Sequence, residues 1–258
     1  MSQTASVPTA APVTADEIVR LDALVIAEKV RRRELSPVAV VEAHLKAIER
    51  ANPTINAVCT LAAEHALETA RRQEEEIGRG RYIGPLAGVP VGIKDITPTA
   101  GIRTTFGSAL YADNVPAEDA LVVQRLKDAG CIVIGKTNTP EFGLGSHTYN
   151  TLFGPTRNPF DPTKSCGGSS GGAAVALALR MVPVADGSDM MGSLRNPAAW
   201  NNVFGFRPSY GRVPRDRPEY LEQLAVSGPM GRSVPDLARL LATMAGFDPR
   251  DPMSIAED

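Results

Sequence analysis

The stretch that decides the fold reads SCGGSSGG at residues 165–172 and GSDMMGSLR at residues 187–195, with a mostly apolar run over residues 173–185 between them. Glycine lets the backbone approach other groups closely and adopt dihedral angles that other residues avoid. The apolar run predicts a buried helix followed by a short strand. This order of loop, helix, strand and loop can bring the glycine-flanked serines Ser169 and Ser193 to one end of a sheet.

A lysine belongs with these two serines. Residues 88–95 read GVPVGIKD, so Lys94 ends an apolar strand beside glycines. This position favours burial, and burial disfavours the charged form of an amine. The ordinary pKa of lysine is about 10.4, and burial can lower it by roughly 3–5 units. We therefore expect Lys94 to be able to accept a proton near neutral pH.

The pattern outside this stretch predicts an α/β domain. Apolar runs predict strands over residues 86–93 and 131–135, with a helix over residues 116–129 between them. This order implies a crossover connection in a largely parallel sheet. The other predicted elements are helices over residues 14–33, 36–51, 61–77, 196–200 and 234–245 and a strand over residues 201–206, with Asn52 and Pro53 ending the second of these helices.

Length and composition set the broad class. At 258 residues and 43% hydrophobic, the chain is long enough to bury one sizeable core. We expect a disordered tail over residues 1–13, which has neither the basic nor the apolar region of a signal peptide, and a single domain over residues 14–258. The net charge of −2, without an extended basic tract, argues against nucleic acid as a partner. No apolar run reaches the roughly 18 residues that a membrane span needs.

The cysteines indicate the compartment. Cys59, Cys131 and Cys166 are odd in number, scattered, and without the spacing of a metal site. We expect free thiols in a reducing compartment, and therefore a cytoplasmic protein that holds no metal.

The chain resembles the amidase signature family, whose members are serine hydrolases with a Lys–Ser–Ser triad. Besides the two glycine-rich loops and Lys94, the resemblance includes GKTNTPEF at 135–142, TRNP at 156–159 and GFRPSYGR at 205–212, and it covers most of the chain after about Ser36. It implies an α/β fold with a mixed, mostly parallel central sheet flanked by helices. Members of the family run well past the point where this chain ends, so the resemblance implies that the C-terminal part, which completes the sheet and covers the substrate pocket, is missing.

The resemblance also implies the catalytic roles. Ser193 is the nucleophile, Ser169 is the bridging serine, and Lys94 is the base. The proton then passes from Ser193 through Ser169 to Lys94 and returns to the leaving nitrogen. The family joins the bridging serine to the residue before it, here Gly168, by a cis peptide bond.

The loop that contains Ser193 supplies the oxyanion hole in this family. The implied donors are the backbone N–H groups of Met190, Met191, Gly192 and Ser193. Met191 stands where the commoner family pattern has glycine. Two interpretations of Met190 and Met191 stay open: they line the acyl pocket and favour apolar acyl groups, or they fill gaps in the core.

Neighbouring polar residues support the loops. Asp189 and Arg195 match the family and are expected to hold the shape of the loop through hydrogen bonds. Ser170 and Thr137 are further candidates for the same hydrogen-bond network.

The function implied is hydrolysis of an amide-type carbon–nitrogen bond through an acyl-serine intermediate, with a small-molecule substrate and no cofactor. The substrate is an aryl or alkyl carboxamide, or a related carbamate or ester. A homodimer is left open. The alternatives are a glutaminase-type subunit of a tRNA-dependent amidotransferase, which needs partner chains, and an inactive truncated scaffold.

Two rival enzymes fit less well. Residues 167–171 satisfy the G-x-S-x-G elbow of α/β-hydrolases, which needs a histidine after the serine. The histidines, His44, His65 and His147, all precede Ser169. Cys166 suggests a Cys–Glu–Lys amidase of the nitrilase type, but the pattern around the cysteine and lysine of that family is not visible.

Overall fold

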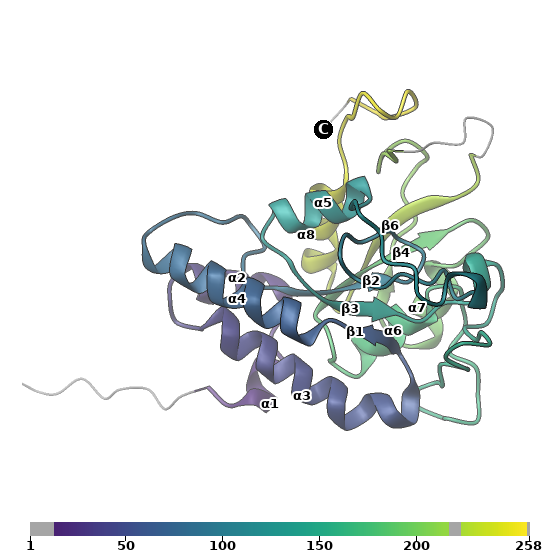
Figure 1. Ribbon diagram of the computed structural model, residues 1–258, viewed down its shortest axis with the longest axis horizontal. Helices are drawn as coiled ribbons and strands as arrows, with labels where there is room; N and C mark the ends of the chain where they lie inside the picture. Colours follow the sequence, from purple (N-terminus) through teal and green to yellow (C-terminus); the bar gives the residue numbers. More distant parts are fainter. Residues whose placement is uncertain (1–12, 217–222, 257–258) are drawn as a thin grey trace, which may run out of the picture.

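The computed structural model describes residues 13–216 and 223–256. In that part of the chain a six-stranded sheet lies at the centre, in the order β1-β3-β2-β4-β6-β5, with helices packed around it (Figure 1). The strands are β1 (Val58–Leu61), β2 (Pro90–Lys94), β3 (Ile132–Thr137), β4 (Val184–Asp189), β5 (Phe204–Gly205) and β6 (Val226–Gly231). The mixed α/β sheet flanked by helices that the sequence predicts is confirmed, but the prediction that it is mostly parallel is wrong: among the described strands, two of the five pairings are parallel and three are antiparallel.

The parallel part of the sheet is its centre. Strand β2 pairs in parallel with both β3 and β4, whereas β1, β6 and β5 pair antiparallel at the two sides. The helices are α1 (Ala15–Ile18), α2 (Ala23–Arg31), α3 (Pro37–Ile55), α4 (Ala63–Gly78), α5 (Leu121–Asp128), α6 (Gly171–Ala178), α7 (Arg195–Trp200) and α8 (Val234–Met244), with short 3-10 helices at Ala109–Tyr111 and Glu141–Gly143. Helices α5 and α6 form the two crossovers, β2–α5–β3 and β3–α6–β4. The carboxyl ends of the parallel strands β2, β3 and β4 therefore lie on the same side of the sheet.

Several predicted boundaries are wrong for local reasons. The helix predicted over residues 14–33 is two helices, because Thr14 caps α1 and Asp22 opens α2. Helix α3 continues through Pro53 to Ile55, and the Asn52 side chain then accepts the N–H groups of Ala57 and Val58.

Further boundaries differ from the sequence prediction. Strand β2 begins at Pro90 and not at residue 86. Helix α5 begins at Leu121 and not at residue 116. The strand predicted over residues 201–206 is only β5. Strand β4 begins at Val184 and extends to Asp189, because it pairs along this whole length with β6, a strand that the pattern did not predict. The tail expected over residues 1–13 lies outside the described residues apart from Val13.

Alternation along the strands divides the core into two apolar clusters. Val133 belongs to one cluster, whereas its neighbours Ile132 and Ile134 belong to the other. Successive strand residues point to opposite faces, so the clusters lie on the two sides of the sheet. The first contains residues of α2, α5 and α8, and the second contains residues of α4, α6 and α7.

Helix α6 packs unusually close to its neighbours. All its residues from Gly171 to Leu177 are buried. A Cβ at Gly172 would lie 2.3 Å from the backbone nitrogen of Asn138, and a Cβ at Gly171 would lie 2.3 Å from Thr148 Oγ1. Glycine at these two positions therefore sets how closely the loop before α6 approaches the rest of the domain.

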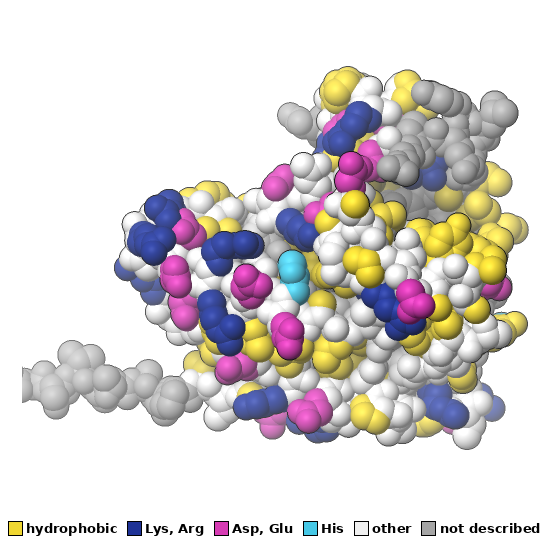
Figure 2. All heavy atoms as spheres, in the orientation of Figure 1, with side chains coloured by type: hydrophobic (Ala, Val, Ile, Leu, Met, Phe, Trp, Pro, Cys, Tyr) yellow, Lys and Arg dark blue, Asp and Glu magenta, His cyan; other side chains and the backbone are white. Residues whose placement is uncertain are grey.

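Charged and apolar side chains are unevenly distributed on the face that Figure 2 shows. Figure 2 shows Lys, Arg, Asp and Glu side chains over α4 and hydrophobic side chains gathered on the opposite side of the view. Among the described residues, none of the helices has the length and apolar character that a membrane crossing requires. Within the same residues, no group of three His, Cys, Asp or Glu side chains is placed to hold a metal ion.

Candidate active site

Lys94 is the last residue of β2, and its side chain is fully buried. Its Nζ donates hydrogen bonds to Ser169 Oγ at 2.7 Å and to Ser188 Oγ at 2.9 Å. Both acceptors are hydroxyl groups, and no carboxylate in the described residues lies within ion-pair distance of this amine. The sequence therefore predicted the pairing of Lys94 with Ser169 correctly but missed Ser188.

The environment of Lys94 changes its protonation. Burial lowers the pKa of Lys94 from 10.5 to about 7, although the charges of Asp186 and Asp189 oppose the shift. A substantial fraction of the Lys94 side chains is then uncharged at neutral pH. An uncharged amine that already contacts a serine hydroxyl can act as a general base.

Ser169 lies in the loop that precedes α6 and is buried. The peptide bond between Gly168 and Ser169 is cis, as the resemblance implies. Thr148 holds this loop: its Oγ1 donates to the carbonyl of Gly167 at 2.9 Å and accepts the N–H of Gly171 at 3.0 Å. The loop thereby presents the Ser169 hydroxyl to Lys94.

Ser193 lies in the turn between β4 and α7 and is partly exposed. Its carbonyl accepts the N–H of Ser170 at 3.2 Å, so the two glycine-flanked loops are in contact, as predicted. The Ser170 hydroxyl reinforces this contact by donating to the carbonyl of Ser188 at 3.3 Å. No hydrogen bond joins the Ser193 and Ser169 hydroxyls. The structure therefore contains the hydrogen bond between Lys94 and Ser169, but not the one between Ser169 and Ser193 that the predicted proton path also needs.

Asp189 organises the loop around Ser193. It is fully buried, and its carboxylate accepts the N–H groups of Gly192 at 2.7 Å and Leu194 at 3.1 Å. Arg195 donates two hydrogen bonds to it, and Arg207 donates another at 3.0 Å. Burial raises the pKa of Asp189, but these hydrogen bonds outweigh burial and hold the pKa well below its ordinary value. Arg207 was missed as a site residue, although it belongs to the GFRPSYGR motif.

The predicted oxyanion donors divide into two groups. The N–H of Gly192 is already donated to Asp189, so Gly192 is not a free donor and this part of the prediction is corrected. The N–H groups of Met190, Met191 and Ser193 make no hydrogen bond to the described residues. Met191 is 84% exposed and Met190 is 38% exposed, so neither side chain fills a gap in the core.

A cavity of about 800 Å³ opens beside this site. Ser188, which accepts a hydrogen bond from Lys94, is part of its wall. Many of its lining residues belong to the segment between β2 and α5. Its walls include Ile96, Phe106, Tyr111, Pro116 and Val226. The cavity therefore reaches the hydrogen-bond network of the lysine.

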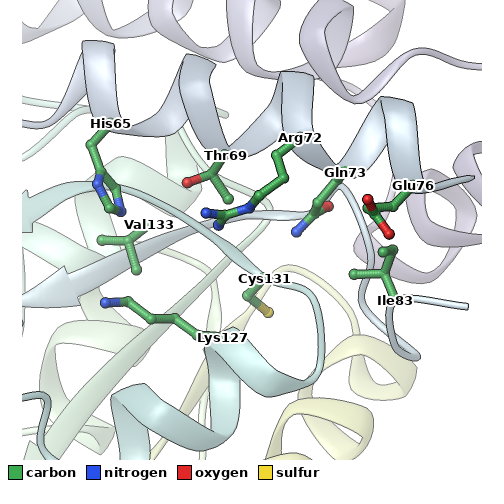
Figure 3. A pocket seen from close by; sticks show the side chains of 9 residues that line it. All are labelled: His65, Thr69, Arg72, Gln73, Glu76, Ile83, Lys127, Cys131 and Val133. Atoms are coloured by element: carbon green, nitrogen blue, oxygen red, sulfur yellow. The ribbon is translucent and has the colours of Figure 1, made fainter. Parts of the chain in front are cut away.

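A second cavity, of about 290 Å³, lies between α4, α5 and β3 (Figure 3). His65, Arg72 and Lys127 point toward it, but Lys127 is paired with Asp119 at 2.8 Å. Its wall includes Cys131, which directly precedes β3, and Val133 near the start of that strand. Lys94, in contrast, pairs with Thr137 at the other end of β3. This cavity is therefore separate from the serines and Lys94.

The rival nucleophiles are unsuitable. Cys166 is buried, and burial raises the pKa of its thiol to about 12, so it is not a thiolate at neutral pH. His147 Nδ1 lies 2.7 Å from Ser165 Oγ and makes no hydrogen bond to Ser169 or Ser193. Both observations agree with the sequence analysis, which rejected the nitrilase type and the α/β-hydrolase elbow.

Lys94 is buried at the end of a parallel strand and donates a hydrogen bond to Ser169, which follows a cis peptide bond. This arrangement in a mixed sheet is that of an amidase signature protein. The chain belongs to the amidase family: the family model described as Amidase matches residues 39–257.

Known relatives are similar over most of this chain. A glutamyl-tRNA(Gln) amidotransferase subunit from Carboxydothermus hydrogenoformans is 46% identical over 239 residues, which are 92% of this chain and 49% of that protein. The corresponding subunit from Thermus thermophilus is 46% identical over 231 residues, 89% of this chain and 47% of the relative. The chain thus spans about half the length of the curated relatives it matches.

Solved structures agree with the fold. A bacterial aryl acylamidase of the amidase signature family superimposes with a TM-score of 0.88 at 39% identity, covering 92% of this chain and 50% of the other. The peptide amidase of Stenotrophomonas maltophilia superimposes with a TM-score of 0.83 at 34% identity, covering 93% of this chain and 50% of the other. The described fold is therefore that of about half of an amidase signature enzyme.

Proposed function

We propose that this chain carries the catalytic part of an amidase that hydrolyses an amide-type carbon–nitrogen bond through an acyl-serine intermediate on Ser193. The observation that supports this most directly is the amine of Lys94. It is fully buried, has a pKa of about 7, and lies 2.7 Å from Ser169 Oγ. A buried amine whose hydrogen-bond acceptors are hydroxyl groups is suited to removing a proton from one of them.

The proposed reaction begins with a proton transfer. Uncharged Lys94 accepts the proton of Ser169, which accepts the proton of Ser193 as the Ser193 oxygen attacks the substrate carbonyl. This step requires the Ser193 hydroxyl to turn toward Ser169 when the substrate binds. The negative charge that forms on the carbonyl oxygen is stabilised by the N–H groups of Met190, Met191 and Ser193.

The intermediate then collapses. The proton held by Lys94 returns through Ser169 to the leaving nitrogen, the carbon–nitrogen bond breaks, and the acyl group stays on Ser193. Water attacks this ester with the same groups acting as base and acid, which releases the carboxylic acid. No metal or organic cofactor takes part in the proposed reaction.

Part of the cavity wall suits an aryl or alkyl group. The cavity beside Ser188 has room for an aryl or alkyl group, and Phe106, Tyr111 and Val226 give it apolar walls. Exposed Met190 and Met191 are free to contact the acyl group. We therefore propose an aryl or alkyl carboxamide as the substrate, with carbamates and esters as related substrates.

One alternative function has specific support. The similar relatives of Carboxydothermus and Thermus are amidotransferase subunits, which supports a glutaminase role in a complex with partner chains. A panel that contains glutamine, an aryl amide, an ester and a carbamate separates the two proposals. Hydrolysis of the aryl amide by the isolated chain supports the amidase, and hydrolysis of glutamine only after partner subunits are added supports the alternative.

Labelling with a fluorophosphonate tests the nucleophile. We expect the reagent to attach to Ser193, as located by mass spectrometry, and the Ser193→Ala variant to remain unlabelled. Ser209→Ala is the matched control, because this serine is exposed and outside the site, and it should label like the wild type. Labelling of Ser193→Ala at the wild-type rate would refute the assignment. A folded wild-type chain that resists the reagent would favour an inactive scaffold.

A further inference from the structure

A second buried lysine lies beside the site, and the proposed reaction does not use it. Lys136 is on β3, next to β2, and its side chain is fully buried. Its Nζ donates hydrogen bonds to the carbonyl of Thr97 at 2.5 Å and to Thr99 Oγ1 at 2.8 Å. Thr97 follows Lys94 in the loop after β2. The two buried lysines are therefore connected through this loop.

A buried carboxylate meets the same loop from the other side. Asp186 on β4 is 1% exposed. Its Oδ1 accepts the backbone N–H of Lys94 at 2.5 Å, and its Oδ2 accepts the hydroxyl of Thr97 at 2.9 Å. Both oxygens accept hydrogen bonds, which is the pattern of an ionised carboxylate. Asp186 thus contacts the backbone of the base, while neither lysine amine lies within ion-pair distance of it.

The carboxylates that act on Lys94 both lie on β4. Lys94 is faced by two carboxylates of β4, Asp186 and Asp189, and the latter is paired with Arg195 and Arg207. Asp186 is therefore the carboxylate near Lys94 that no arginine neutralises.

The groups that face Lys136 come from several elements. They are Asp95, Asp186, Cys59 and Asp119, in decreasing order of effect after burial. Burial raises the pKa of Asp186, and the nearby charge of Lys136 contributes to lowering it. The charge of Asp186 therefore acts on both buried amines. A positive charge on Lys136 offsets the effect of Asp186 on Lys94.

We propose that Asp186 and Lys136 are positioning residues for the base: Asp186 fixes the end of β2 through the Lys94 N–H, and the charge of Lys136 balances Asp186 so that the Lys94 amine can be uncharged. The proposal rests on the proposed function only for the role of Lys94 as base. It assigns a purpose to two buried charged residues that do not touch the serines.

The wild-type protein gives the first test. Burial lowers the pKa of Lys94 to about 7 and that of Lys136 to about 8. Nitrogen NMR of ¹⁵N-lysine-labelled protein follows the Nζ signals of both residues as the pH is changed. We expect Lys94 to lose its proton at a lower pH than Lys136. The reverse order would overturn the proposal, and this result does not depend on any variant or on turnover.

Two variants should move the titration of Lys94 in opposite directions. Asp186→Asn removes a negative charge and keeps an acceptor for the Lys94 N–H, so the pKa of Lys94 should fall by about one unit. Lys136→Met removes the balancing positive charge, so the pKa of Lys94 should rise. If Asp186 and Lys136 only served packing, the two variants would not shift the pKa of Lys94 in opposite directions. Both variants moving the titration the same way, or not at all, would refute the proposal.

Asp95→Asn is the matched control. Asp95 is also a buried carboxylate and influences Lys136, but it is not among the charges that act on Lys94. Its variant should lower the pKa of Lys136. Because this weakens the charge that balances Asp186, the pKa of Lys94 should rise, but by less than in Lys136→Met. If Asp186→Asn does not fold, as judged by circular dichroism, two results still test the proposal. They are the pKa shift of Lys94 in Lys136→Met and the order in which Lys94 and Lys136 lose their protons in the wild type. The same shifts should appear in the pH dependence of fluorophosphonate labelling; shifts in NMR without any labelling would refute the proposed function alone.

Discussion

Burial of titratable side chains is the dominant feature at the scale of single residues. Lys94 and Lys136 are both fully buried, and burial lowers the pKa values of both amines. The protein therefore maintains two unusual amines in its interior. At a pH where these amines are uncharged in the folded chain but protonated in the unfolded chain, they reduce the free energy of unfolding. Their pKa shifts can therefore be detected from stability, without an activity assay.

Stability should rise with pH between about 7 and 8.5. In this range the unfolded chain keeps protons on both lysines, whereas the folded chain loses them with pKa values of about 7 and about 8. The unfolded chain thus binds more protons, and it becomes less favourable as the pH rises. The free energy of unfolding therefore increases, by up to about 1.4 kcal/mol per pH unit for each lysine. Urea unfolding midpoints measure this, and Lys94→Met should reduce the slope. A midpoint that falls over this range would contradict the account.

The sequence predicted some site residues and missed others for a definite reason. Ser169 and Lys94 were predicted because glycine-rich loops and a strand end mark them, and the structure places them in contact. Ser188 and Asp186 were missed because both belong to a strand that the sequence analysis placed too early, ending it at residue 185. A residue assigned to a loop cannot be given a side-chain direction, so their contacts with Lys94 were not foreseeable.

At the scale of elements, close packing of α6 holds the Ser169 loop in place. The apolar run after Gly172 predicts a buried helix here, and α6 confirms it. The need for glycine at Gly172 was not predictable, because it depends on Asn138 in another part of the chain. Weak strands were missed for a related reason: β6 reads VSGPMG, which carries little strand signal, and it forms by pairing with β4.

Substituting Gly172 by alanine tests this packing. The new Cβ would lie 2.3 Å from the Asn138 nitrogen and 2.7 Å from the Ala57 carbonyl oxygen, so backbone must move. We expect a loss of about 1–3 kcal/mol in the free energy of unfolding. Gly78→Ala in α4 is the control, because nothing lies within 4 Å of its added Cβ, and it should be neutral or stabilising by up to about 1 kcal/mol. Equal effects of the two substitutions would argue against the close approach of α6.

At the scale of the whole molecule, the chain spans about half the length of its curated relatives yet contains Lys94, Ser169 and Ser193, which we propose as base, bridging serine and nucleophile. The cavity beside Ser188 and the exposed side chains of Met190 and Met191 lie next to these residues. The fold class was predictable because strand, helix and strand alternate along the chain. The antiparallel sides of the sheet were not predictable, because β1 and β5 are short, β6 carries little strand signal, and the pairing of all three is set by distant residues.

The central claim is that uncharged Lys94 drives the reaction of Ser193. The most direct test is the rate of fluorophosphonate labelling of Ser193 from pH 5 to pH 9 in the wild type and in Lys94→Met. Since burial lowers the pKa of Lys94 to about 7, the wild-type rate should rise with pH and level off above that value. In Lys94→Met the rate should fall by about 10²–10⁴-fold and lose this dependence. A Lys94→Met variant that labels at the wild-type rate with the same pH profile would contradict the account.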